Sequence, residues 1–245
     1  MDRDVYVRMA ALEQAHWWFQ ARRVMIARVI ERLVRPGAEA KLLEAGCGSG
    51  GNLAMLKEFG HVEAFEFDEE ARRLAAERTG QRIPHGALPD VVPFDEKRFD
   101  LIGMFDVLEH IEADQAALAA LRERLAHDGA LLVTVPAFPR LWSRHDETHH
   151  HFRRYTRQSL TAVAKAAGYR CETAFYFNTF LFPLAIATRA AKAITGSDTP
   201  DDALPAGWLN TVLRRIFAAE RHFVGRVRFP FGLSLCAGLR PMEDA

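Results

Sequence analysis

Short apolar runs alternate with amphipathic segments along the first two thirds of the chain. Runs typical of buried strands cover residues 40–46, 61–68, 99–105 and 130–138. Apolar residues recur at helical spacing over residues 16–34, 52–60, 69–80 and 114–129. Strands separated by helices of about ten residues are typical of a parallel, doubly wound sheet. In such a sheet, ligands bind at the carboxyl ends of the strands.

The pattern changes after residue 175. Residues 175–188 carry no charge, but Pro183 interrupts them and they are too short to span a bilayer. Residues 208–228 are then typical of an amphipathic helix. Its apolar stripe is Trp208, Leu209, Val212, Leu213, Ile216 and Phe217, and arginines surround it at 214, 215, 221, 226 and 228. This pattern suits a membrane surface, a cap over an apolar substrate, a dimer interface or simple packing on the core. Residues 229–241 predict a last strand.

Composition narrows the classes of function. The chain has 245 residues, of which 49% are hydrophobic, and this is enough for one sizeable core. Thirty-two basic and 32 acidic residues cancel, so no overall field favours nucleic acid. Cys47, Cys171 and Cys236 form no CxxC pair, which argues against a disulfide framework and favours a cytoplasmic setting. The first residues lack the apolar segment of a secretion signal.

A glycine-rich turn follows the first predicted strand, in the stretch LLEAGCGSGG. Gly46, Gly48 and Gly50 leave the backbone open to close approach by a ligand. Glu66 stands near the end of the second strand, where a carboxylate can accept hydrogen bonds from both hydroxyls of a ribose. The turn therefore predicts a nucleoside cofactor. Glu44 can bind an ammonium group but would repel a pyrophosphate, which favours S-adenosylmethionine over NAD. The glycine spacing alone also suits a dinucleotide.

Residues 16–175 resemble the class I S-adenosylmethionine-dependent methyltransferases, in the broad subgroup that includes the ubiquinone-pathway O-methyltransferases. The stretches that carry the resemblance are LLEAGCGSG, AFEFDEEARRLA, FDLIGMFDVLEHI and LRERLAHDGALLVTVP, in the family's order and spacing. We therefore expect an α/β fold with a doubly wound, mostly parallel, seven-stranded Rossmann-like sheet and helices on both faces. A single domain would cover residues 1–245. Its parts would be an N-terminal helical cap (1–38), a cofactor-binding core (39–175), a helical insertion (176–228) and the last strand and tail (229–245).

The resemblance implies a cofactor role for each matching residue. The backbone from Gly46 to Gly50 would wrap the methionine part, Glu44 would contact its amino group, and Glu66 would hold the ribose. Phe67 would lie against the adenine, and Arg22 or Arg23 would pair with the cofactor carboxylate. Many relatives carry an acid for the adenine where this chain has Ala87 and Leu88, so backbone groups near Ala87, or Asp90, would replace it. The full predicted set is Arg22, Glu44, Gly46, Cys47, Gly48, Gly50, Asn52, Glu66, Phe67, Ala87, Leu88, Phe105 and Asp106.

A second group of residues is predicted to face the methyl acceptor. His110 is the first candidate for a general base, because it follows a strand whose end opens onto the site. His149 and His151 come next, in the segment 142–160, which resembles a lid over the substrate. Each of these histidines could equally be structural. Contacts with the acceptor are predicted for Trp18, Glu109, His145, Arg153 and Tyr155.

A metal ion is only a lesser alternative. Glu109, His110 and a further acid could hold a divalent cation, and His145 with His149 has the i,i+4 spacing of zinc ligands but lacks an evident third ligand. No metal is therefore included in the predicted site.

The preferred function is O-methylation of a hydrophobic or lipid-linked small molecule, with no nucleic acid as partner. An NAD(P)-dependent oxidoreductase and a catalytically silent S-adenosylmethionine-binding protein are the alternatives. Residues 176–228 are expected to contact the inner face of a membrane or to form a homodimer.

Overall fold

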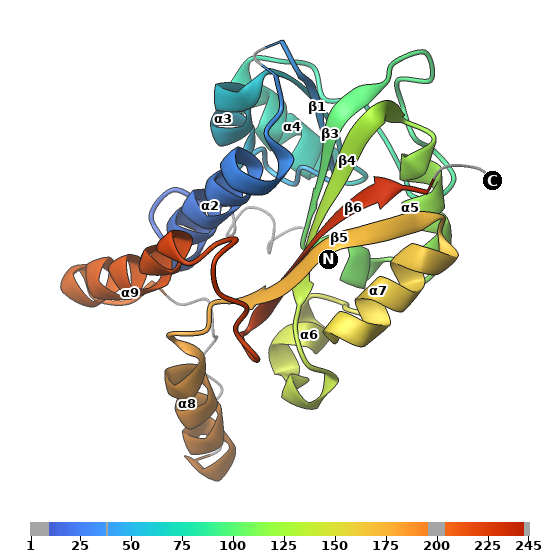
Figure 1. Cartoon of the computed structure of the whole chain (residues 1–245). Helices are drawn as coiled ribbons and strands as arrows, with labels where there is room; N and C mark the ends of the chain where they lie inside the picture. Colours follow the sequence, from blue (N-terminus) through green and yellow to red (C-terminus); the bar gives the residue numbers. More distant parts are fainter. Residues whose placement is uncertain (1–9, 38, 196–203, 243–245) are drawn as a thin grey trace.

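The computed structural model describes residues 10–37, 39–195 and 204–242, which form one sheet flanked by helices (Figure 1). The strands are β1 (Lys41–Ala45), β2 (His61–Phe65), β3 (Phe99–Phe105), β4 (Leu125–Pro136), β5 (Tyr169–Phe177) and β6 (Ser234–Pro241). Their order across the sheet is β2-β1-β3-β4-β6-β5. The strand β6 is antiparallel to both of its neighbours, and the other three pairs are parallel.

The sheet has six strands in the described part of the chain, where seven were predicted. Beside the end of β2, the chain makes only isolated bridges, between Glu66 and His85 and between Ala87 and Val91. Two prolines, at positions 84 and 89, lie in this segment. Because proline lacks the N–H that a sheet ladder requires, a regular strand does not form here.

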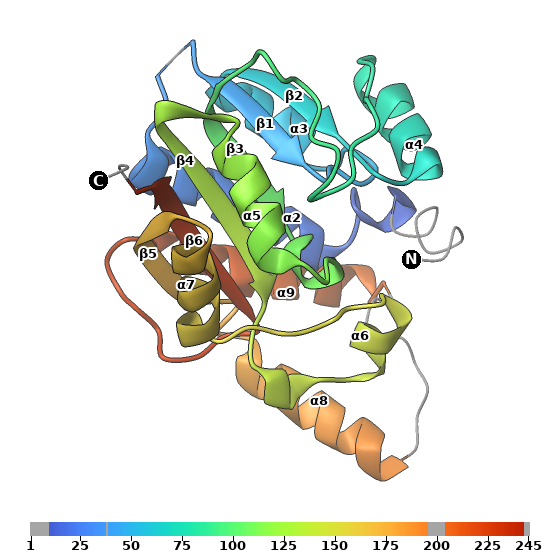
Figure 2. The same ribbon diagram turned by 90° about the vertical axis from the view of Figure 1, so that its right-hand side faces the viewer.

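Helices cover both faces of the sheet (Figure 2). They are α2 (Trp17–Val29), α3 (Leu53–Leu56), α4 (Glu69–Thr79), α5 (Asp114–Arg122), α6 (Arg144–Thr148), α7 (Arg157–Ala166), α8 (Phe182–Thr195) and α9 (Gly207–Ala219). Successive strand residues point to opposite faces and so enter two separate cores. Leu43 and Leu131 lie in the core shared with α5 and α7, whereas Leu42 and Leu132 lie in the core shared with α2, α3 and α9.

The boundary between α5 and β4 differs from the prediction. A helix was expected to continue to residue 129, but α5 ends at Arg122 and β4 begins at Leu125, which pairs with Phe99 of β3. Burial of Leu125 and pairing with β3 outweigh the modest helical preference of these residues. The predicted helix at 52–60 is also shorter, because α3 ends at Leu56 and a 3-10 turn (Lys57–Phe59) follows.

The carboxyl ends of β1, β2, β3, β4 and β5 meet at one edge of the sheet. The helices α8 and α9 connect β5 to β6, so this part of the chain leaves the sheet at the same edge. The helix α9 packs on α2, whereas α8 projects from the body of the molecule in both views (Figure 1 and Figure 2). Within the described ranges, no helix has the length and apolar character needed to cross a membrane.

Candidate active site

The glycine-rich turn lies at the carboxyl end of β1, between the ends of β2 and β3. Gly46, Gly48 and Gly50 have φ values of 75°, 54° and 78°, a region that strains any residue with a side chain. A Cβ atom on Gly46 would come within 2.8 Å of Val107 Cγ2, so one side of the turn is tightly packed. A Cβ atom on Gly48 would meet nothing within 4 Å. The turn therefore keeps one side open to a ligand.

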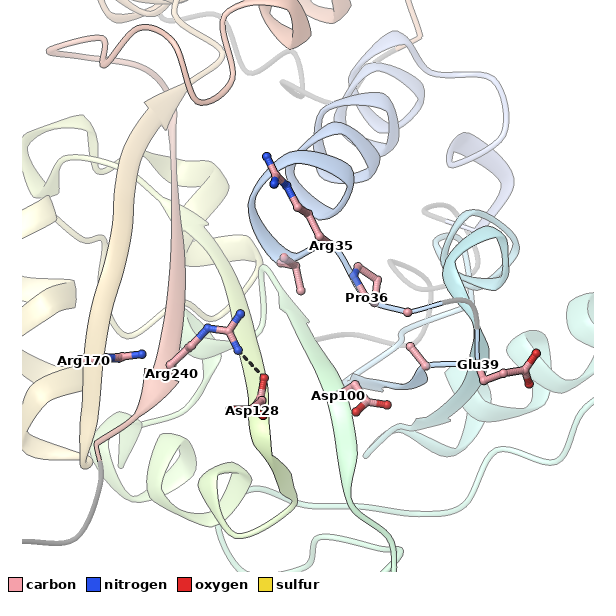
Figure 3. Close-up of a pocket in the computed structure, with 10 residues that line it drawn as sticks. Arg35, Pro36, Glu39, Asp100, Asp128, Arg170 and Arg240 are labelled. Carbon is pink, nitrogen blue, oxygen red and sulfur yellow. Dashed lines mark hydrogen bonds between the residues drawn. The ribbon is translucent and has the colours of Figure 1, made fainter.

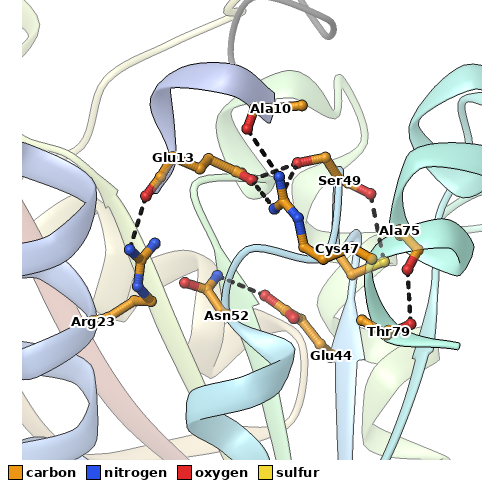
Figure 4. Close-up of polar contacts among 11 residues, drawn as sticks. Ala10, Glu13, Arg23, Glu44, Cys47, Ser49, Asn52, Ala75 and Thr79 are labelled. Atoms are coloured by element: carbon orange, nitrogen blue, oxygen red, sulfur yellow. Dashed lines mark hydrogen bonds and ion pairs between the residues drawn. The ribbon is translucent and has the colours of Figure 1, made fainter. Parts of the chain in front are cut away.

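Glu44, near the end of β1, is a buried acid with unused bonding capacity. Its Oε1 accepts a hydrogen bond from Asn52 Nδ2 at 2.7 Å (Figure 4). Its Oε2 has no hydrogen-bond partner among the described residues. Burial raises the pKa of Glu44 to about 8, against opposing effects of Asn52 and Arg22. A cation beside Oε2 would stabilise the ionised carboxylate, so the site fits the ammonium group predicted from the sequence.

Glu66 closes the turn instead of standing free at the end of β2. Its Oε2 accepts a hydrogen bond from the Gly48 N–H at 2.8 Å. Its Oε1 accepts bonds from the N–H groups of Phe67 and Asp68 at 2.8 Å and 3.0 Å. A carboxylate has about four acceptor positions, so one remains, on Oε2. In this arrangement Glu66 can accept a hydrogen bond from one ribose hydroxyl, where two were expected. Cys47 in the same turn is buried, and burial raises the pKa of its thiol.

The residues predicted to contact the adenine lie beside this turn and differ in their freedom to bind. Phe67 is 67% exposed, and the centre of its ring lies 5.7 Å from that of His85. Its ring is therefore available to stack on a flat ligand. Ala87 and Val91 each donate a backbone N–H to the carbonyl oxygen of the other, so the Ala87 N–H is already used. Leu88 packs against the apolar core.

The N-terminal segment 10–15 lies over the glycine turn (Figure 4). The Glu13 carboxylate accepts a hydrogen bond from Ser49 Oγ and pairs with Arg78, while its carbonyl oxygen accepts a bond from Arg23 Nη2 at 2.8 Å. A Cβ atom on Gly51 would lie 2.6 Å from Glu13 Oε2, so a larger residue there would displace the Glu13 carboxylate. No sequence pattern indicated this contact, because Glu13 and Ser49 are 36 positions apart.

Arg22 of α2 links the ends of β3 and β4. It forms an ion pair with Asp106, which follows β3, and donates a hydrogen bond from Nη2 to Thr134 Oγ1 of β4 at 3.0 Å. Its guanidinium lies 5.1 Å from the ring centre of Trp18 and 5.8 Å from that of Phe105. The predicted residues Trp18, Arg22, Phe105 and Asp106 are thus brought together. Arg22 Nε has no hydrogen-bond partner in the described part of the chain.

Three potential acid–base groups meet next to this cluster. One carboxylate oxygen of Glu109 and one ring nitrogen each of His110 and His151 lie within 4.8 Å of one another. Burial, together with the neighbouring His151 and His149, lowers the pKa of His110 to about 3. Burial, with the nearby Asp106 charge, raises the pKa of Glu109 well above its ordinary value. His110 is therefore neutral at neutral pH, and a base with so low a pKa removes a hydroxyl proton poorly. The same three donors could also supply ligands to a divalent cation.

His151 is held in a defined orientation by Asp146. Its Nδ1 lies 2.9 Å from Asp146 Oδ1, which also accepts a hydrogen bond from Arg154 Nε at 2.7 Å. Asp146 is fully buried, which opposes its ionisation, but the bonds from His151 and Arg154 hold its pKa well below the usual range. With a proton on Nδ1 bound to the carboxylate, Nε2 of His151 is left as an acceptor. No role was predicted for Asp146. The spacing of Ser143 and Asp146 could have indicated the N-terminal capping box that they form on α6.

The other predicted residues of the lid lie either beside His151 or against the start of α5. His145 and His149 belong to α6 and its end, with ring centres 4.2 Å apart and about 6 Å from that of His151. Arg153 pairs with Asp114 at 2.6 Å, and the Tyr155 hydroxyl donates to the same carboxylate at 2.8 Å. Arg153 and Tyr155 were predicted to contact the acceptor, but in this arrangement they attach the lid to the start of α5.

A cavity of about 620 Å³ lies far from this site, at the amino ends of the strands (Figure 3). Its charged lining residues are Arg35, Glu39, Asp100, Asp128, Arg170 and Arg240. Arg240 pairs with Glu172 and donates to the Asp128 carbonyl oxygen, so acids and bases in this region offset one another. The glycine turn, at the opposite edge, is where a sheet of this kind binds its ligand.

Comparison with known families identifies the family of the chain. Residues 17–174 match the methyltransferase domain family. This chain belongs to that family. It is an S-adenosylmethionine-dependent methyltransferase, which confirms the predicted enzyme class and sets aside the oxidoreductase alternative. The unpaired Oε2 of Glu44 and the open side of Gly48 are the features of this chain that fit such a cofactor.

Individual relatives of this methyltransferase are distant. It is 28% identical over 165 residues to a malonyl-[acyl-carrier protein] O-methyltransferase of Enterobacter lignolyticus, and 31% identical over 99 residues to an uncharacterized methyltransferase of Staphylococcus carnosus. The matches span 64% and 39% of this chain, and 64% and 47% of those relatives' own lengths.

Solved structures share the fold of this methyltransferase. A chain of the complex between the Haloferax volcanii Trm112 methyltransferase activator and a methyltransferase matches with a TM-score of 0.65 and 16% identity, over 99% of this chain and 96% of that one. A TehB-like S-adenosylmethionine-dependent methyltransferase of Corynebacterium glutamicum matches with a TM-score of 0.54 and 20% identity, over 88% and 86% of the two chains. At these identities, the likeness shows the fold alone.

Proposed function

We propose that this methyltransferase transfers the methyl group of S-adenosylmethionine to a hydroxyl oxygen of a hydrophobic or lipid-linked small molecule. The hydrogen-bonded pair of His151 and Asp146 carries this proposal, because a hydroxyl acceptor needs a base and the pair supplies one. The relative from Enterobacter lignolyticus is named for O-methylation of malonyl-[acyl-carrier protein], and this supports an oxygen acceptor.

The cofactor is proposed to bind along the edge formed by the ends of β1, β2 and β3. Glu44 Oε2 would accept a hydrogen bond from the ammonium group, and Glu66 Oε2 would accept one from a ribose hydroxyl. The Nε–H of Arg22 would donate to the cofactor carboxylate while its Nη2 remains on Asp106 and Thr134. Phe67 would stack on the adenine. The backbone of the glycine turn supports these contacts by leaving space at Gly48.

The residues of the lid are proposed to move the acceptor proton. The bound cofactor supplies a methyl group that its positive sulfur already activates. His151 Nε2 takes the proton of the acceptor hydroxyl, and Asp146 stabilises the resulting imidazolium through Nδ1. Arg154 keeps Asp146 in place. Neutral His110, whose ring centre lies 4.6 Å from that of His151, can hydrogen-bond to the acceptor and orient it.

A methyl-transfer assay with labelled S-adenosylmethionine tests this function. The acceptor panel would contain apolar phenols, long-chain alcohols and acyl chains with a free carboxylate, each offered free and attached to a carrier. Transfer to a hydroxyl gives an ether that survives mild alkali, whereas transfer to a carboxylate gives an ester that does not. We expect an alkali-stable product. Labelled product that is an ester, or that carries the methyl on nitrogen, would contradict the proposed hydroxyl acceptor.

A further inference from the structure

The outer side of α9 exposes a row of apolar side chains. Trp208, Val212 and Ile216 follow at intervals of four residues and are 72%, 42% and 37% exposed. The inner side of the same helix is core, because Phe217 is fully buried and its ring centre lies about 6 Å from those of Trp17 and Phe177. The structure thus divides the apolar stripe of the sequence into a packed half and an exposed half.

Exposed phenylalanines continue this apolar surface beyond α9. The rings of Phe180, Phe223 and Phe229 form a cluster with centres 5.7 to 5.8 Å apart, and the Phe182 and Phe231 rings lie 5.0 Å apart. Phe180, Phe223 and Phe231 are each more than a third exposed. These residues join the start of α8 to the segment that follows α9. Exposed aromatic residues gathered in this way mark an interaction surface.

The charges on this surface are of one sign. Exposed arginines lie on α9 and in the segment after it, at positions 214, 215, 221, 226 and 228. From residue 204 to residue 233 the only acid is Glu220, which is buried. The aspartates at 198, 201 and 202 lie outside the described residues. The apolar surface is therefore bordered by cations with no exposed acid among the described residues of these two segments.

This charge pattern favours an anionic lipid surface over a second copy of the chain. A two-fold dimer interface uses the same patch on both subunits, so it would set arginines against arginines. Anionic headgroups instead attract each arginine, while aromatic and aliphatic side chains enter the boundary between headgroups and acyl chains. Tryptophan, the most exposed residue of the row, is favoured at that boundary.

We infer that the start of α8, the helix α9 and the segment 223–231 form a docking surface for anionic membranes. Because these elements leave the sheet at the carboxyl end of β5, docking would bring the edge that carries the glycine turn toward the bilayer. An apolar acceptor could then reach the site from the membrane. Docking itself requires neither cofactor nor acceptor, so it can be tested independently of the proposed methyl transfer.

Vesicle flotation without cofactor or acceptor tests this inference. Wild-type protein should float with vesicles that contain phosphatidylglycerol in phosphatidylcholine, and should stay unbound with phosphatidylcholine alone. Binding should fall at about 0.5 M salt, where charges are screened within a few ångströms. The double substitution Arg215→Glu with Arg221→Glu should weaken binding by at least about tenfold. The matched control, Lys57→Glu with Lys165→Glu, changes the same charge on exposed residues of other elements and should bind like wild type.

A second pair of substitutions tests the apolar row. Trp208→Ser with Val212→Ser should weaken binding to anionic vesicles, with an unchanged unfolding temperature as the check on folding. Wild-type protein that stays unbound with anionic vesicles at low salt would overturn the inference. So would a dimer in light scattering that the same serine substitutions convert to monomer without changing vesicle binding, because the row would then belong to a protein interface.

Discussion

At the scale of single residues, burial decides which groups of the site carry a proton. Loss of water disfavours the charged form, so the pKa values of Glu44 and Glu109 rise and that of His110 falls. Asp146 is the exception because His151 and Arg154 bond to its carboxylate. Groups that lie close together therefore differ in protonation state at neutral pH, and this difference assigns their roles.

Replacement of Glu44 tests the proposed contact with the cofactor ammonium. Glu44→Gln should weaken binding of S-adenosylhomocysteine by roughly 10- to 100-fold, because a hydrogen bond to a charged group is lost in a buried place. Without cofactor, the pKa of Glu44 is about 8, whereas the proposed contact with the ammonium group requires the ionised carboxylate. The affinity of the wild-type protein for S-adenosylhomocysteine should therefore rise from about pH 6 to about pH 8. The variant should lack this rise. Calorimetry measures both effects, and exposed Glu58→Gln is the control. Equal affinities for wild type and Glu44→Gln would place the ammonium elsewhere.

Replacement of His151 tests the proposed base. His151→Ala and Asp146→Asn should each lower kcat by roughly 100-fold while leaving the dissociation constant of S-adenosylhomocysteine unchanged. Exposed His127→Ala should behave like wild type. His110 was the first candidate in the sequence, but its lowered pKa of about 3 means that its protonation cannot reduce the rate above about pH 4. Full turnover by His151→Ala would show that the reaction needs no base at this position.

At the scale of elements, one buried acid joins α9 to the start of α8. Glu220 directly follows α9, and its Oε1 accepts a hydrogen bond from the Phe180 N–H at 2.7 Å. Thr179 Oγ1 donates to the Phe231 carbonyl oxygen at 2.7 Å, so the same turn also holds the segment before β6. Burial raises the pKa of Glu220 to about 7, against the backbone bonds that favour the ionised form.

The stability of this junction should depend on pH. The folded pKa of Glu220 lies above the ordinary value of 4.5, so its contribution to stability is complete below about pH 4.5 and is lost as the pH rises through 7. The loss amounts to at most about 3 kcal/mol. Glu220→Gln stays neutral, and its free energy of unfolding should fall less between pH 5 and pH 8. Urea unfolding over that range measures the difference from wild type. Exposed Glu123→Gln should follow the wild-type profile, and identical profiles for all three proteins would refute the expectation.

At the scale of the whole molecule, the cofactor edge is enclosed by parts far apart in the chain. The N-terminal segment covers the glycine turn through Glu13, α2 contributes Arg22, and α9 packs on the outside of α2. A cofactor that contacts all of these parts should therefore raise the free energy of unfolding of the whole domain.

Ligand-induced stabilisation should follow the family assignment. S-adenosylhomocysteine at about 100 times its dissociation constant adds roughly 2.7 kcal/mol, which corresponds to a rise in Tm of about 5 to 10 °C for a protein of this size. NAD at the same concentration should leave Tm unchanged. Thermal unfolding with each ligand, and with adenosine as the control, measures both. A shift with NAD and none with S-adenosylhomocysteine would contradict the cofactor assignment.

The sequence by itself determined the alternation of strands and helices, the glycine turn and the positions of Glu44 and Glu66. These features depend on neighbours in the chain, through apolar periodicity and the backbone freedom of glycine, so local patterns were enough to reach the methyltransferase family. The prediction of a seventh strand was wrong where two prolines interrupt the segment beside β2, and the α5–β4 boundary was wrong where pairing with β3 prevailed.

Only the tertiary structure decided which side chains meet and which are buried. Arg22 reaches Thr134 across 112 positions of sequence, and the Tyr155 hydroxyl reaches Asp114 across 41. The change in favoured base from His110 to His151 came from burial and from the bond to Asp146. The division of the α9 stripe into buried Phe217 and exposed Trp208 likewise required its packing on α2. Burial and pairing depend on contacts between distant residues, which no local pattern contains.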